Sequence, residues 1–257
     1  MALNPKITDW RGKRVWLVGG STGIGASLAK ALAREGARLA LSARSEAGLR
    51  EVASGMDGAL VEPLDVTQAD AFAPALARIT AAWGGVDLVV LNAGTYEPVR
   101  AWELDAARAR RIIDVNLMGV INGVAAVVPT LLTQGCGAIV IVGSVSGYRG
   151  LPKALVYGAS KSALINFAET LWVDLAPRGI GVHLVSPGFV ATPLTAQNEF
   201  AMPGLITADQ AAQEIMRGLA KGQFEIHFPK GFTRWLKLLE WLPYPLYFRA
   251  VRRMTGL

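Results

Sequence analysis

The amino-acid sequence predicts an α/β fold with one mostly parallel sheet and helices on both faces. Short apolar runs typical of buried strands alternate along the chain with longer stretches that have the period of a helix. Hydrophobic residues make up 52% of the 257 residues, which is enough for a large buried core in one domain. The single cysteine, Cys136, excludes an internal disulfide and fits a reducing compartment.

A glycine-rich loop follows the first predicted strand. The strand covers residues 14–18 and runs directly into the loop at 19–25, and a helical pattern then continues to Glu35. A strand, a glycine turn and a helix in this order bring backbone N–H groups and a helix N-terminus up to a pyrophosphate. Glycines also make ordinary tight turns, but this position favours a nucleotide site. Its expected contacts are Gly19, Ser21, Thr22, Gly23, Ile24 and Gly25.

The second predicted strand, residues 38–42, ends at Ala43 and Arg44. An acidic residue at that strand end would accept hydrogen bonds from the adenosine ribose, and Ala43 cannot do so. The guanidinium of Arg44 suits a 2′-phosphate instead, although a solvated arginine at a strand end is also common. We therefore expect NADP(H) rather than NAD(H) as the cofactor.

The remainder of the chain continues the alternation of strands and helices. Asn116 lies inside an apolar helical stretch, where asparagine is disfavoured unless its amide has a specific partner. His183 lies inside an apolar strand and is expected to have a structural role. Predicted strands cover residues 59–62, 87–91, 137–143, 180–185 and 224–228, with a polar turn at 64–67, and predicted helices cover residues 70–83, 106–132, 157–176 and 207–220.

Tyr157 and Lys161 lie four residues apart on one of these helices, about one turn from each other. A free tyrosine has a pKa of about 10, and a neighbouring cation lowers that pKa because it favours the phenolate. The pair is therefore a candidate for acid–base work. Taken alone it is a weak signal, since tyrosine and lysine share this spacing on many solvated helices.

Several further motifs occur in a fixed order along the chain. They are Gly19-x-x-x-Gly23-x-Gly25, Asp65, Asn92-Ala93-Gly94, Asn116, Ser144-x-x-Gly147 placed 13 residues before Tyr157-x-x-x-Lys161, and Pro187-Gly188-x-Val190-x-Thr192. With these motifs the sequence resembles the short-chain dehydrogenase/reductase family from about Gly12 to Phe228. Val18 stands where the family usually has threonine, and Leu91 replaces an asparagine. Both departures should weaken turn hydrogen bonds more than the chemistry.

The resemblance implies a Rossmann-type, doubly wound parallel sheet of about seven strands in a three-layer α/β/α arrangement. It also implies an oxidoreductase that interconverts a carbonyl and an alcohol by hydride transfer. The alternative is a nucleotide-sensing or scaffold protein that kept the fold and lost catalysis. Besides the glycine loop and Arg44, the residues expected at the cofactor are Asp65, Val66, Asn92, Ala93, Gly94, Tyr157, Lys161, Pro187, Gly188, Val190 and Thr192.

The resemblance also assigns the catalytic roles. Tyr157 would donate a proton to the substrate oxygen, and the Ser144 hydroxyl would hold that oxygen. Lys161 would lower the pKa of Tyr157 and bind the nicotinamide ribose, and Asn116 would position a water that links Lys161 to solvent. Ser146 is a rival for Ser144, but its distance from Tyr157 in the sequence is two residues too short.

The positive charge is concentrated in residues 230–257. This segment has six basic residues and only Glu240 as an acid, a net charge of +5, so residues 1–229 carry +1 of the total of +6. A near-neutral body gives no support to nucleic-acid binding. Basic residues mixed with aromatics are typical of an interfacial membrane anchor, and packing over the substrate cleft or burial in an oligomer interface are the alternatives. The side chains that can share one helical face here are Trp235, Leu238, Leu239 and Leu242.

Residues 1–228 are expected to form a single dinucleotide-binding and catalytic domain, and residues 229–257 its basic aromatic extension. Without an uninterrupted apolar run of about 18 residues or a secretory pattern, we expect a cytoplasmic protein, with peripheral membrane contact as an option. One cysteine and two histidines without close spacing predict no metal site.

The family's substrate loop corresponds to residues 194–206, where apolar side chains predict a pocket for a lipophilic carbonyl or alcohol. The resemblance also implies a homodimer or homotetramer. The residues expected to form the pocket wall are Leu194, Phe200, Met202, Leu205 and Ile206.

Overall fold

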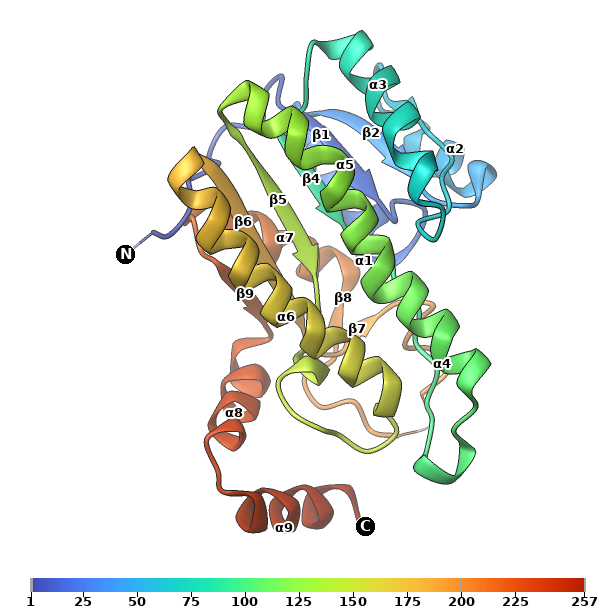
Figure 1. Ribbon diagram of the computed structural model, residues 1–257, viewed down its shortest axis with the longest axis vertical. Helices are drawn as coiled ribbons and strands as arrows, with labels where there is room; N and C mark the ends of the chain where they lie inside the picture. Colours follow the sequence, from blue (N-terminus) through green and yellow to red (C-terminus); the bar gives the residue numbers. More distant parts are fainter. Residues whose placement is uncertain (1, 199, 257) are drawn as a thin grey trace.

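The computed structural model describes residues 2–198 and 200–256, so residue 199 of the expected substrate loop and residue 257 of the extension lie outside the described residues. Within these ranges, seven strands form one parallel sheet in the order β3-β2-β1-β4-β5-β6-β9 (Figure 1). The order runs outward from β1 in both directions, which is the doubly wound arrangement expected from the sequence. The strands are β1 Arg14–Val18, β2 Arg38–Ser42, β3 Leu60–Val61, β4 Leu88–Leu91, β5 Gly137–Val142, β6 Ile180–Pro187 and β9 Glu225–Phe228, and β7 Val190–Ala191 pairs separately with β8 Ile206–Thr207.

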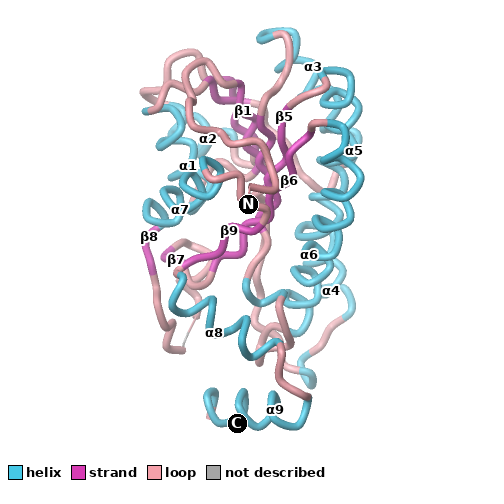
Figure 2. The backbone as a smooth tube through the Cα atoms, turned by 90° about the vertical axis from the view of Figure 1, so that its left-hand side faces the viewer, coloured by secondary structure: helices cyan, strands magenta, loops and turns pink. Residues whose placement is uncertain are grey.

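Helices cover both faces of the sheet (Figure 2). Alternate residues of β1 point to opposite faces: Leu17 belongs to the core under α1, α2 and α7, whereas Trp16 packs edge-on against Phe72 in the core under α3, α5 and α6. The predicted three-layer α/β/α architecture is therefore confirmed. The helices are α1 Gly23–Arg34, α2 Glu46–Ala53, α3 Phe72–Trp83, α4 Ala106–Ile113, α5 Gly119–Gln134, α6 Leu155–Leu175, α7 Ala208–Ala220, α8 Lys230–Glu240 and α9 Tyr244–Thr255.

One predicted helix differs from expectation in its interior. The helix predicted over residues 106–132 forms as α4 and α5, which are joined by a π-helical turn at Asp114–Met118. A π-turn inserts one extra residue and changes which side chains point inward, and such turns are frequent at functional sites. Asn116 lies in this turn and is fully buried.

The continuous helical stretch Ala106–Gln134 has 29 residues and a window of mean hydropathy 1.8, so by length and composition it could cross a bilayer. We expected no segment long enough to cross a bilayer because we considered only uninterrupted apolar runs. By helix length and mean hydropathy, that expectation was wrong. In the fold, Val124, Val127 and Leu131 are buried in the core beneath α3 and α5. These contacts make the stretch a core helix of one α-layer.

The C-terminal extension forms two helices whose inner faces pack on the segment that follows β5. Leu236 and Leu239 of α8 form a small core with Val145, together with Tyr247 and Val251 of α9. The helical face predicted from the sequence forms only in part, because Leu239 is buried in this small core. Trp235 and Leu238 are 41% and 69% exposed, and α8 ends at Glu240, before Leu242.

His183 has the structural role expected of it. It is fully buried in β6, and its Nδ1–H donates to the carbonyl of Gln223 at 2.6 Å. Its other ring nitrogen, Nε2, has no hydrogen-bond partner among the described residues. A second proton would create a buried cation with no acceptor at Nε2, and burial accordingly lowers the pKa of His183 to about 4.

This lowered pKa predicts loss of stability in acid. The unfolded chain takes up the proton below about pH 6.5, whereas the folded chain takes it up only below about pH 4, so stability falls as the pH drops through this window. Between pH 7.5 and pH 5, His183 should account for a loss of about 2 kcal/mol in the free energy of unfolding. The measurement is urea unfolding of wild type and His183→Gln at both pH values. Between them, the free energy of unfolding should drop less in His183→Gln than in wild type, by that amount, because the variant retains only His227. Equal drops in the two proteins would contradict this role.

Candidate active site

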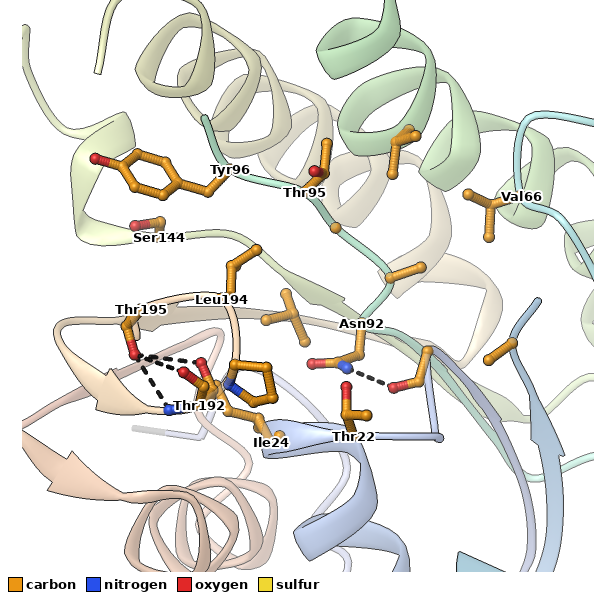
Figure 3. Close-up of a pocket in the computed structure, with 18 of the residues that line it drawn as sticks. Thr22, Ile24, Val66, Asn92, Thr95, Tyr96, Ser144, Thr192, Leu194 and Thr195 are labelled. Atoms are coloured by element: carbon orange, nitrogen blue, oxygen red, sulfur yellow. Dashed lines mark hydrogen bonds between the residues drawn. The ribbon is translucent and has the colours of Figure 1, made fainter. Parts of the chain in front are cut away.

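A cleft of about 820 Å³ lies at the carboxyl edge of the sheet, where residues that follow several strands meet (Figure 3). This is the edge at which open parallel sheets bind ligands. Of the expected site residues, Gly25 and Asn116 do not line the cleft. Those that line it are Gly19, Ser21, Thr22, Gly23, Ile24, Arg44, Asp65, Val66, Asn92, Ala93, Gly94, Ser144, Tyr157, Lys161, Pro187, Gly188, Val190 and Thr192.

The glycine loop packs backbone to backbone against the loop after β4. Gly19 has φ +91°, and a Cβ atom there would lie 2.5 Å from the nitrogen of Ala93. The side-chain amide of Asn92 donates to the carbonyl of Gly19 at 2.8 Å. A Cβ atom at Gly25 would lie 2.1 Å from that same carbonyl oxygen, so the third glycine of the motif supports the loop from beneath rather than lining the cleft.

The far end of the cleft holds the residues expected near the adenosine. Ala43, Arg44 and Ser45 line it directly after β2. Asp65 also lines it, and one of its carboxylate oxygens accepts hydrogen bonds from the backbone N–H and the hydroxyl of Thr67 at 3.0 and 2.9 Å. These bonds fix the turn that carries Asp65 and Val66 at the cleft wall.

Ser144, Tyr157 and Lys161 meet on the opposite side. Ser144 precedes the short 3₁₀ turn at Val145–Gly147, and its hydroxyl accepts from the N–H of Ser146 at 3.1 Å. Gly147 lets this turn touch α6, because a Cβ atom there would lie 2.7 Å from the carbonyl group of Lys161. Ser144 lines the cleft, whereas its rival Ser146 is absent from the described residues that do so.

The protonation of the pair differs from expectation. Burial raises the pKa of Tyr157, and a hydrogen bond with Ser144 offsets only part of that rise. The amino group of Lys161 lies 5.7 Å from the centre of the Tyr157 ring and donates to the carbonyl of Val142 at 3.0 Å. Lys161 is itself buried, and burial lowers its pKa to about 8. Desolvation is therefore the main influence on the pKa of Tyr157, whereas we expected Lys161 to lower it.

Asn116 has the specific partner that its position requires. Its amide oxygen accepts from the N–H of Thr95 at 2.7 Å, and its amide nitrogen donates to the carbonyl of Thr95 at 2.9 Å and to the hydroxyl of Ser160 at 3.2 Å. A Cβ atom at Gly94 would lie within 3.4 Å of the Asn116 oxygen and 3.7 Å of the Lys161 nitrogen, so both groups flank Gly94. Asn116 therefore holds the loop after β4 next to Lys161.

The loop after β6 is fixed by one hydroxyl. Thr195 donates to the carbonyls of Val190 and Thr192 at 2.5 and 3.1 Å and accepts from the N–H of Thr192 at 3.1 Å (Figure 3). These contacts present Pro187, Gly188, Val190 and Thr192 along one wall of the cleft.

Tyr96 is a site residue that sequence reasoning missed. Its ring meets the ring of Tyr157 edge to face, with centroids 4.9 Å apart. Gln197 donates to the carbonyls of Tyr96 and Leu194 at 2.8 and 3.0 Å, which links the loops on the two sides of the cleft. The signal available in the sequence was position: Tyr96 lies two residues beyond the Asn-Ala-Gly motif, at the carboxyl end of a predicted strand.

The expected pocket wall is only partly formed. Leu194 lines the cleft, but Phe200, Met202, Leu205 and Ile206 are not among the described residues that do so. Phe200 packs edge-on against Phe189 instead, and Leu205 is 45% exposed. The prediction failed for these four because apolar composition does not reveal which way a loop side chain points.

The cleft fits a dinucleotide cofactor. Its volume lies within the range of ligand sites, roughly 300–1,000 Å³. Thr22 precedes α1 without a side-chain cap, so the first N–H groups of that helix face the cleft without an intrahelical partner. Arg44 takes part in no ion pair within the described residues, so its guanidinium can bind a phosphate. The residues present therefore suit a phosphorylated, anionic ligand.

Comparisons with known proteins agree with this geometry. Residues 13–202 match the family model described as short chain dehydrogenase. An uncharacterized oxidoreductase of Myxococcus xanthus is 39% identical to this chain, and the match covers 93% of this chain and 96% of the relative. The 11-beta-hydroxysteroid dehydrogenase A of Sesamum indicum is 32% identical, and the match covers 91% of this chain and 75% of the relative. The crystal structure of a short chain dehydrogenase/reductase from Burkholderia phymatum in complex with NAD superimposes with a TM-score of 0.83 at 25% identity, covering 90% of this chain and 94% of that one. With the fold, the cleft and the family model in agreement, the chain belongs to the short-chain dehydrogenase family of oxidoreductases.

Proposed function

We propose that this oxidoreductase uses NADP(H) and interconverts a lipophilic carbonyl compound and its alcohol, working mainly as a reductase. The observation that carries the proposal is the meeting of Ser144, Tyr157 and Lys161 in the cleft that Arg44 lines at its other end. A bound nicotinamide supplies or accepts the hydride, and the protein supplies binding, orientation and the proton.

The protonation of Tyr157 favours reduction. With a pKa above its ordinary value, its phenol stays protonated at neutral pH, which is the form that can donate to an alkoxide forming on the substrate. The Ser144 hydroxyl, hydrogen-bonded to Tyr157, is placed to hold the same oxygen. Lys161, with a pKa of about 8, can pass a proton on near neutral pH, and Asn116 would position a water beside it.

Arg44 supports NADP(H) over NAD(H). It follows β2 at the place where an acidic residue would select the free ribose, and Ser45 beside it offers a hydroxyl. The Burkholderia phymatum relative binds NAD, so the choice between the cofactors depends on residues particular to each chain.

A lipophilic substrate is supported by the apolar part of the cleft. Tyr96, Pro193 and Leu194 line the cleft, and the ring of Tyr96 meets that of Tyr157. The Sesamum indicum relative is named for a hydroxysteroid. A homodimer or homotetramer and a cytoplasmic location with peripheral membrane contact complete the proposal. The alternative, a nucleotide-sensing or scaffold protein, predicts cofactor binding without turnover.

Tyr157→Phe tests the proton donor. We expect turnover of a verified carbonyl substrate, followed by NADPH absorbance, to fall by about 100-fold or more, because the variant has no proton to donate. NADPH binding measured by fluorescence should change little. Tyr244→Phe, which removes a hydroxyl from the exposed surface of α9, is the matched control and should keep full turnover. Near-wild-type turnover in Tyr157→Phe would refute the assignment.

Arg44→Asp tests the cofactor preference. The dissociation constant for NADPH should rise by roughly tenfold or more, because a charge-assisted contact to the 2′-phosphate is replaced by repulsion. The constant for NADH should change much less. Arg34→Asp, on the exposed end of α1, controls for the change in net charge. Equal weakening of both cofactors would count against the 2′-phosphate role.

Tyr96 should position the substrate through its ring. Tyr96→Ala removes the edge-to-face contact with Tyr157 and should raise KM for the carbonyl substrate by roughly tenfold while NADPH affinity is retained. Tyr96→Phe keeps the ring and should stay close to wild type in both. A Tyr96→Ala enzyme with an unchanged KM would show that the ring does not contact the substrate.

A further inference from the structure

The extension has two faces with opposite surroundings. On the inner face, Leu236, Leu239 and Tyr247 are buried against the protein. On the outer side of α8, of α9 and of the turn between them, large apolar side chains are exposed to solvent, up to 86% for Trp241 in that turn. We call this outer face the docking surface; its apolar members are Trp235, Leu238, Trp241, Tyr244, Leu246 and Phe248, and its basic members are Arg234, Arg249 and Arg253.

We propose that the docking surface binds an anionic lipid bilayer and that the enzyme takes its lipophilic substrate from that bilayer. The first clause specifies the membrane contact of the proposed function, and the second rests on its lipophilic substrate. Aromatic side chains settle at the headgroup level of a bilayer, and basic side chains beside them attract anionic headgroups.

The charge of the extension selects this partner. Six basic residues and Glu240 give it a net charge of +5, Lys237 pairs with Glu225 of β9, and α9 contains three arginines and no acidic residue. In a symmetric dimer built on this face, the same surface would meet itself, so each positive patch would face another. The repulsion disfavours a second copy of the chain here, whereas an anionic bilayer complements both the charge and the apolar side chains.

The location of the docking surface suits a substrate delivered from lipid. Figures 1 and 2 both show α9 at one end of the molecule. The strand arrows in Figure 1 point toward that end, and residues that follow the strands line the cleft there. The loops beside the cleft expose further apolar side chains, with Trp102 at 80% and Leu104 at 53%. A bilayer that meets α9 therefore lies on the cleft side of the protein.

Specific contacts tie the docking surface to the catalytic side. Arg149 donates to the carbonyls of Leu239, Glu240 and Leu242 at 3.1, 3.0 and 2.6 Å. Its guanidinium also stacks 4.1 Å from the ring centre of Tyr247, whose hydroxyl donates to the carbonyl of Gly150 at 2.5 Å. The segment held in this way begins at Ser144, so the position of the extension and that of the catalytic serine are fixed together.

The test is co-sedimentation of the full-length protein with vesicles. Wild type should sediment with vesicles of phosphatidylcholine mixed with phosphatidylglycerol, and much less with phosphatidylcholine alone. The double variant Arg249→Glu, Arg253→Glu should lower the partition coefficient at least roughly tenfold, since each basic residue near an anionic surface contributes to binding. Trp241→Ala with Phe248→Ala should weaken binding to the same vesicles through the apolar contact.

The matched control is Lys30→Glu with Arg34→Glu, which reverses two exposed charges on α1 and should sediment like wild type. All docking-surface variants should keep wild-type turnover of a water-soluble carbonyl substrate, so loss of vesicle binding is measured separately from the proposed chemistry. The proposal is overturned if wild type fails to sediment with the anionic vesicles, or if the Arg249/Arg253 variant sediments as well as wild type. A shift from dimer to monomer in that variant, without vesicle binding by wild type, would assign the surface to self-association instead.

Discussion

The close approach of two backbone loops, at Gly19 and Ala93, is the constraint on which the rest of the site depends. There is no room between them for a Cβ atom, since one at Gly19 would lie 2.5 Å from the Ala93 nitrogen. The hydrogen bond from Asn92 to the Gly19 carbonyl holds the two loops together. Because β1 and β4 are parallel neighbours, this contact sets the floor of the cleft, and the cofactor side and the catalytic side are built outward from it.

Burial, more than pairing, sets the proton chemistry on the catalytic side. The neutral phenol of Tyr157 is favoured because its charged form would be desolvated, and the same effect brings the pKa of Lys161 to about 8. In the proposed function, this protonated phenol donates the proton and the lysine with a pKa of about 8 replaces it. Asn116 contributes by holding Thr95, so that Gly94 lies between its amide and Lys161.

Features encoded by local pattern were predictable from the sequence. Strands β1 and β2 begin and end where expected, and the capping box at Thr207 and Gln210 begins α7. What escaped prediction depends on partners distant in the sequence: the side-chain amide of Asn116, in the π-turn, bonds the backbone of Thr95, and Tyr96 becomes a site residue only when its ring meets Tyr157. The side of α8 that becomes buried also depends on distant partners, because Leu236 and Leu239 meet Val145 only in the folded chain. The catalytic roles stay predictions.

The two faces of the extension explain why its composition gave an ambiguous signal. Leucines and aromatic residues lie on both faces of the extension. On one face they pack against the segment after Ser144, and on the other they are exposed to solvent. Arg149, from outside the extension, binds the carbonyls of Leu239 and Glu240 at the end of α8, a favourable place for a cation at a helix C-terminus, and that of Leu242 beyond it. The extension is thereby fixed while its outer face stays open to a partner. A partner that binds this face would therefore lie at the end of the molecule that carries the cleft.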